Sequence, residues 1–147
     1  MGRSYVIILI ALALAGCTTS HGLKPISPEI SSETASLRPI FKWEASSNPT
    51  AKYDFAIFDI IEKRSAQVGL AHVLKVPGET VYYRQGLEKN EHVLEADLKA
   101  GKEYLWSVRV RDGQKVERWS TYDSSVFYGV GYSNRKNQFF LFKVLEK

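Results

Sequence analysis

The chain has 147 residues with 44% hydrophobic and 12% aromatic residues, which is enough for one domain with a core of its own. The formal net charge is +4, and acidic and basic residues are interspersed, which is typical of a solvated surface and argues against a nucleic-acid-binding face. The single cysteine, Cys17, excludes an internal disulfide, so the core alone must hold the fold.

The N-terminus has the layout of a secretory signal peptide. One positive charge, on Arg3, precedes an apolar run over residues 5–16, and polar residues follow from Thr18. The run is about a dozen residues long, whereas a membrane-spanning helix needs about 20. We therefore expect a cleaved signal.

The end of this segment, Leu14-Ala15-Gly16-Cys17, resembles the lipobox of bacterial lipoproteins. The resemblance implies cleavage before Cys17, a diacylglycerol on its sulfur and acylation of its new amine. Two or more acyl chains anchor a protein stably to a membrane. The alternative is ordinary secretion with an incidental cysteine.

The residue after the cysteine bears on location within the cell envelope. Thr18 stands where an aspartate would favour retention at the inner membrane, so the resemblance implies the outer membrane. The expected parts of the chain are a signal peptide over 1–16, the lipidated cysteine and a short flexible tether over 17–25, and one domain over 26–147.

From residue 26 onward the sequence predicts strands and almost no helix. Short strands with turn signals about every 8–12 residues are typical of a β-sandwich or a barrel. A hairpin is expected around Pro77-Gly78, which is a turn dipeptide. The expected strands are 39–44, 53–61, 72–76, 80–85, 91–96, 103–111 and 138–145.

Two of these strands have informative patterns. Residues 53–61 are apolar on both faces, which predicts a central strand buried on both sides. Residues 103–111 alternate, with Tyr104 and Trp106 on one face and Arg109 on the other, which predicts a half-buried strand.

Leu98, Gly101 and Tyr104 follow one another at a spacing of three, with Trp43 upstream. This pattern resembles the fibronectin type III family and implies a single all-β, fibronectin III/immunoglobulin-like β-sandwich over 26–147. In that family the tyrosine hydroxyl hydrogen-bonds the backbone a few residues back. The glycine gives the turn its backbone freedom, and the tryptophan fills the space between the sheets.

The segment between Trp119 and Gln138 is longer than that family usually has there. A mobile loop with aromatic and basic residues would bind a glycan or a protein partner. The favoured alternative is a strand over 124–130, paired with 138–145 through a polar turn at 133–137. The candidate binding residues are Tyr122, Phe127, Tyr128, Tyr132, Arg135 and Lys136.

Other residues offer weaker candidates. Tyr82 and Tyr83 are adjacent in a predicted strand, so one of them must point away from the core. His92 and the other histidines have no ligand-spaced partners, so no metal site is expected. Asp54 and Asp59 resemble strand-face acids that favour solubility, and no nucleophile motif or phosphate-binding loop accompanies them.

The sequence therefore predicts a non-enzymatic, membrane-anchored envelope lipoprotein without a cofactor. Its sandwich would bind another envelope protein, for instance by strand addition at a sheet edge. The alternative is a lipoprotein that binds glycan or peptidoglycan through the aromatic residues of 122–132. A small hydrolase is a third reading, and it would need a cleft with convergent acids.

Overall fold

The computed structural model describes residues 18–67, 70–128 and 131–146, and the regular elements in these ranges are all β-strands. The all-β class expected from the sequence is confirmed. The strands are β1 (Thr18–His21), β2 (Pro25–Ser27), β3 (Ser32–Thr34), β4 (Ile40–Trp43), β5 (Lys52–Gln67), β6 (Leu70–Leu87), β7 (Glu91–Val93), β8 (Glu103–Asp112), β9 (Lys115–Val116), β10 (Thr121–Tyr128), β11 (Gly131–Gln138) and β12 (Phe140–Val144).

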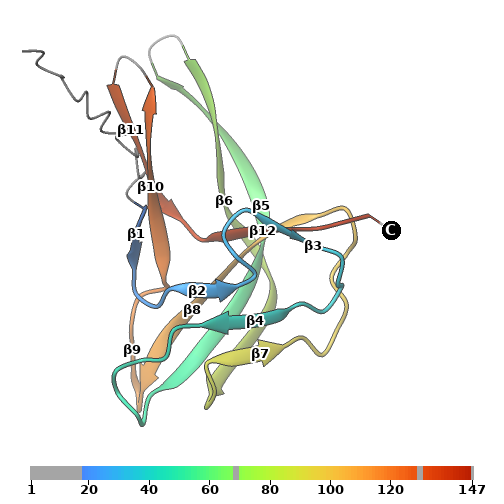
Figure 1. Ribbon diagram of the computed structural model, residues 1–147, viewed down its shortest axis with the longest axis vertical. Helices are drawn as coiled ribbons and strands as arrows, with labels where there is room; N and C mark the ends of the chain where they lie inside the picture. Colours follow the sequence, from blue (N-terminus) through green and yellow to red (C-terminus); the bar gives the residue numbers. More distant parts are fainter. Residues whose placement is uncertain (1–17, 68–69, 129–130, 147) are drawn as a thin grey trace, which may run out of the picture.

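The strands of the described ranges form three sheets (Figure 1). The largest has the order β3-β12-β8-β5-β6, with β9 paired to β8. A second sheet has the order β2-β4-β7, and a third has the order β1-β10-β11. Neighbouring strands are antiparallel except β3 and β12, which run parallel. Strands distant in the sequence, such as β5, β8 and β12, are therefore neighbours in one sheet.

An aromatic core joins the β2-β4-β7 sheet to the largest sheet. Trp43 of β4 stacks on Phe55 of β5 with ring centroids 5.9 Å apart, and Phe41 of β4 meets Trp106 of β8 edge-on at 5.2 Å. All four rings are fully buried. Large rings bury the most apolar area per residue. Trp43 thus lies between two sheets, in a β-sandwich-like arrangement.

The turn before β8 is held by a hydroxyl and a glycine. The amide of Lys99 donates a hydrogen bond of 3.0 Å to the Tyr104 hydroxyl, five residues along the chain. Gly101 has φ of +75°, a conformation that residues with a Cβ rarely adopt. Leu98, just before this turn, is buried. The contact has the form expected from the sequence.

Strand β5 is central only in its first half. Residues Lys52 to Phe58 pair with β8 on one side while β6 pairs on the other. Beyond Phe58, β5 continues with β6 alone as a two-stranded ribbon, which extends toward the top of Figure 1. Ile61 is 50% exposed there. Burial on both faces therefore ends before residue 61, because the pairing with β8 ends at Phe58.

The prediction of a hairpin around Pro77-Gly78 is wrong. Residues 70–87 form one continuous strand, β6, which pairs with β5. Pro77 lies opposite Ile60, next to irregular register. Strand β6 is the last strand of its sheet. An edge strand tolerates a proline, which has no N–H to donate, because one side of the strand has no neighbour.

The pairing expected for residues 121–138 is also wrong in part. Strand β10 forms a hairpin, but with β11 rather than with 138–145, and residues 133–137 lie within β11 instead of forming a turn. Strand β12 pairs with β8 and β3. Phe140 and Phe142 are buried in the core, so the last strand belongs to the sandwich and β10 pairs locally.

The residues expected to form a tether also pair in strands. Thr18 to His21 form β1, which lies along β10 with Thr18 opposite Ser124, and Pro25–Ser27 forms β2 beside β4. Threonine has a favourable β-propensity, and pairing satisfies backbone groups that a free tether would leave to water. The prediction of a flexible tether from the polar composition of this segment is therefore wrong for the residues that form β1 and β2.

Candidate functional site

The outer face of β5 and β8, opposite the core, carries a buried carboxylate. Asp54 is 0% exposed. Arg111 donates to it twice, from Nε to Oδ1 at 2.8 Å and from Nη2 to Oδ2 at 2.7 Å. Arg109 donates from Nε to Oδ2 at 3.1 Å. The Gly86 amide donates at 3.2 Å and the Tyr83 hydroxyl at 3.4 Å. The carboxylate of β5 is thus surrounded by donors from the two neighbouring strands, β6 and β8.

This arrangement fixes the charge of the cluster. Burial by itself raises the pKa of Asp54, but hydrogen bonds from Arg111, the Gly86 amide and Arg109 outweigh it and hold the pKa below its ordinary value. The hydrogen bond to Asp54 also raises the pKa of Arg111. Two guanidinium groups therefore share one carboxylate at neutral pH, which leaves one positive charge in excess.

Aromatic rings lie beside these charges. The guanidinium of Arg109 is 4.4 Å from the ring centroid of Trp119. Phe58 and Tyr83 meet the Trp119 ring edge-on, with centroids at 6.0 and 6.4 Å. Tyr83 is 43% exposed and Trp119 is half-buried. We name this surface the aromatic–arginine face, and it consists of Asp54, Phe58, Tyr83, Arg109, Arg111 and Trp119.

The segment after β9 positions Trp119 over the sheet. The Glu117 amide donates to the Val110 carbonyl and the Ser120 amide to the Val108 carbonyl, each at 2.9 Å. The buried Ser107 hydroxyl donates to the Ser120 carbonyl at 2.5 Å. These bonds hold the segment alongside β8. The Trp119 indole therefore lies above the outward side chains of that strand.

The two adjacent tyrosines of β6 point in opposite directions, as expected from the alternation of a strand. Tyr83 belongs to the aromatic–arginine face. Tyr82 turns inward, where its hydroxyl lies 2.7 Å from Nε2 of His92 and its ring packs against Phe55. Burial, and then the nearby charge of Arg84, lowers the pKa of His92. The outward tyrosine is therefore the one available to a partner.

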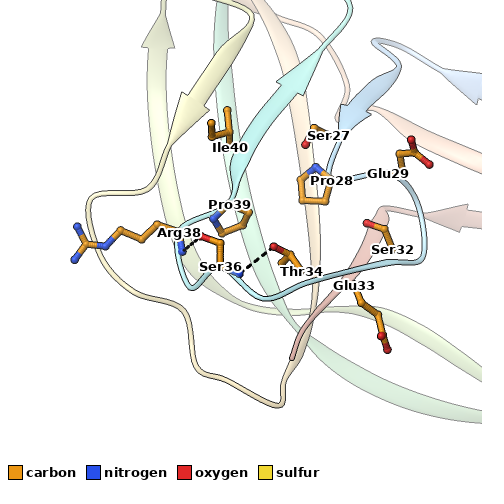
Figure 2. Close-up of a pocket in the computed structure, with 10 residues that line it drawn as sticks. All are labelled: Ser27, Pro28, Glu29, Ser32, Glu33, Thr34, Ser36, Arg38, Pro39 and Ile40. Carbon is orange, nitrogen blue, oxygen red and sulfur yellow. Dashed lines mark hydrogen bonds between the residues drawn. The ribbon is translucent and has the colours of Figure 1, made fainter. Parts of the chain in front are cut away.

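A hollow of about 550 Å³ lies along residues 27–40. Figure 2 shows Arg38 extending away from it, and Arg38 pairs with Asp97. The hydroxyls of Thr34 and Ser36 accept from backbone amides two residues on (Figure 2). Glu33 pairs with Lys143. The polar groups are thus engaged locally and do not converge on a bound group.

The predicted binding residues of β10 and β11 do not form one exposed strip. Tyr122 is only 6% exposed and stacks on Phe140. Phe127 and Tyr128 belong to β10, and Phe127 lies opposite Tyr132 of β11. Arg135 and Lys136 also belong to β11. The side chains of Phe127, Tyr128, Tyr132, Arg135 and Lys136 lie outside the described residues, as do Cys17 and the residues Leu14, Ala15 and Gly16.

Sequence reasoning missed the central group of the aromatic–arginine face. Asp54 was interpreted as a solubility residue, although it lies in a strand that was expected to be buried on both faces. A buried charge requires partners. The alternation of Arg109 and Arg111 on the outer face of β8 was the available signal for those partners.

Comparison of the chain with known protein families, with curated proteins and with solved structures finds no match. The described residues contain no group of three or more metal-ligating side chains. Nor does any helix in those same ranges have the length and apolar character needed to cross a membrane.

Proposed function

We propose that this chain is a non-enzymatic envelope lipoprotein that is anchored through Cys17 and binds another envelope protein through its sandwich domain. The observation that carries the binding role is the aromatic–arginine face. Tryptophan, tyrosine and arginine are the residues that contribute most to protein interfaces. Trp119 contacts both Tyr83 and Arg109 there, and all three remain partly open to solvent.

We further propose that the domain is a fibronectin III/immunoglobulin-like sandwich. In such domains the first, second and fifth strands share one sheet, while the third, sixth and seventh share the other. Strands β2, β4 and β7 form one sheet here, and β5, β8 and β12 are neighbours in the other, which supports the assignment. The hydrogen bond between Lys99 and Tyr104 supports it as well.

The anchoring role rests on the lipobox-like residues before Cys17, and the outer membrane is the proposed location. We expect the wild-type protein to incorporate labelled fatty acid and to fractionate with membranes. Cys17→Ala should lose the label, because the acceptor sulfur is gone, and should accumulate as a soluble or signal-bearing form. Equal labelling of both proteins would contradict the anchor.

Crosslinking in the intact producing cell tests the binding role. We expect pull-down of the lipidated protein to recover one envelope protein in stoichiometric amount. Tyr83→Ala should reduce this recovery, because it removes an exposed ring of the aromatic–arginine face. Val93→Ala is the matched control, because Val93 is similarly exposed (51%) on the opposite sheet. Recovery of cell-wall glycan without protein would contradict the proposal.

Glycan binding is the alternative function. It requires an exposed row of aromatic rings on which sugars can stack. Burial of Tyr122 removes one of the three tyrosines proposed for this row. The aromatic–arginine face is therefore the better-supported binding surface.

A further inference from the structure

We propose that the aromatic–arginine face binds an acidic, extended segment of the partner protein. A carboxylate of that segment would lie on Arg109, with neighbouring apolar side chains against Tyr83. This partner chemistry rests on the proposed function, because it concerns the same face.

The first reason is that Asp54 leaves guanidinium donors unused. A guanidinium has five N–H donors, and a carboxylate has about four acceptor positions. Asp54 already receives five donors, counting the Gly86 amide and the Tyr83 hydroxyl. Arg109 contributes only its Nε to this set. Its terminal nitrogens have no acceptor among the described residues, and Asp54 has no capacity left for them.

The second reason is that Arg109 is already oriented. Its Nε is held by Asp54 and its guanidinium lies against the Trp119 ring. These contacts restrict the rotamers of a long side chain, so binding costs less conformational entropy. The Arg109 side chain is 21% exposed, which leaves it accessible to a partner. A planar guanidinium fixed in this way suits bidentate binding of a carboxylate.

The third reason is the local charge. Among the described residues, Arg109 and Arg111 form ion pairs only with Asp54, so one positive charge is uncompensated. The nearest basic residue of β5 on this face, Lys52, is already neutralised by Glu88. Charge complementarity therefore calls for an anionic group from the partner.

The fourth reason is the apolar and open border of the face. Tyr83 is 43% exposed on this face, and Val81, 48% exposed, lies nearby on the same strand β6. Strand β6 is the edge of its sheet, with β5 on one side only. An extended segment that enters over this edge and crosses the face directs every second side chain toward it. When the side chains directed toward the face include both apolar and acidic residues, they match Tyr83 and Arg109.

Trp119 provides a signal that is local to this face. The chain has three tryptophans, and Trp43 and Trp106 are fully buried. We would titrate the purified lipidated protein in detergent with a random copolymer of glutamate and tyrosine, and follow tryptophan emission. We expect a saturable change, with tighter binding of the copolymer than of polyglutamate.

Variants separate the fixed guanidinium from general charge. Arg109→Gln should weaken copolymer binding about tenfold, which corresponds to one hydrogen bond to a charged group. Arg109→Lys should also weaken it, because lysine keeps the charge but loses the planar fork. Lys89→Gln removes the same charge at an exposed position elsewhere and should change binding less than about twofold. Tyr83→Ala, a substitution of an exposed ring, should weaken binding with the fold retained.

Three results would overturn the inference. They are the absence of saturable binding, equal weakening by Arg109→Gln and Lys89→Gln, and equal competition by vesicles containing phosphatidylglycerol, which would assign the face to lipid headgroups. The proposed function fails separately, when crosslinking in cells recovers no protein. A recovered partner that binds Arg109→Gln as well as wild type would contradict the acidic segment alone.

Discussion

The two faces of strands β5 and β8 are both buried, but by different chemistry. On the inner face, Phe55 and Trp106 lie fully buried among other rings, with no charged group between them. On the outer face, Asp54 is equally buried, but arginine side chains bind it and an indole lies against one of them. The same strands therefore present an apolar core on one side and an ionic cluster on the other.

This difference separates the parts that hold the fold from the part that is free to bind. Apolar burial is non-directional and stabilises by about 25 cal/mol per Å². A buried ion cluster contributes little net stability, yet breaking it is costly, because the remaining charges lose their partner. The inner face accounts for stability, and the outer face keeps oriented polar groups near the surface.

The largest expected effect is on the inner face. Trp106→Ala should lower the free energy of unfolding by about 3–5 kcal/mol, because it leaves a large cavity among packed rings. Denaturant unfolding measures this loss. Trp119→Ala is the control on the outer face and should cost clearly less, since Trp119 is half-buried. Equal losses would remove the distinction between the faces.

Removal of the carboxylate should have the next largest effect. Asp54→Ala should destabilise by about 2 kcal/mol, below the usual cost of breaking a buried pair because both arginines are partly exposed. Since the pKa of Asp54 is lowered from 3.8, its contribution is present above that value and is lost as pH falls through the lower folded pKa. Unfolding at acidic pH should therefore depend less on pH in the variant. An unchanged pH dependence would contradict the ionised Asp54.

A smaller effect is expected at the turn before β8. Tyr104→Phe should cost about 1 kcal/mol, because the Lys99 amide loses its acceptor. Tyr83→Phe is the control, since the bond from its hydroxyl to Asp54 is long, at 3.4 Å. An unchanged denaturant midpoint for Tyr104→Phe would remove the stabilising role of this turn.

The smallest effect is expected from His92. Burial and the charge of Arg84 lower its pKa from 6.5, so the folded state binds the proton less readily than the unfolded state. Stability should therefore decrease as pH falls below 6.5, until the folded form is protonated as well. Thermal unfolding across this range should show a flatter pH dependence in His92→Gln. A wild-type dependence in the variant would contradict the prediction.

Local sequence patterns correctly predicted the strands whose own residues show which side chains are buried. The alternation of Tyr104 and Trp106 and the apolar run around Phe55 were sufficient to identify β8 and β5. The continuity of β6 through Pro77 was not predictable, because it depends on β6 being the edge strand, which is a property of the whole sheet. The pairing of β10 with β11 was missed for a similar reason. Strand β12 packs into the core beside β8, so it is not available to pair with β10.

The binding face was only partly predictable. The outward position of one of Tyr82 and Tyr83 follows from the alternation of a strand, and the structure identifies it as Tyr83. The local alternation of Arg109 and Arg111 places both on the outer face of β8. It does not identify Asp54 as their partner, because Asp54 is 55 and 57 positions away from them in the chain. Trp119 reaches the face because backbone bonds hold its segment along β8.

Site-specific photo-crosslinking in the intact producing cell tests the central claim most directly. A photoreactive residue would replace Tyr83 on the outer face of the largest sheet or, in a separate strain, Val93 on the opposite sheet. We predict a crosslink to a single envelope protein from position 83 and none from position 93. Crosslinks from position 93 alone, or from neither position, would contradict the assignment of the aromatic–arginine face as the binding surface.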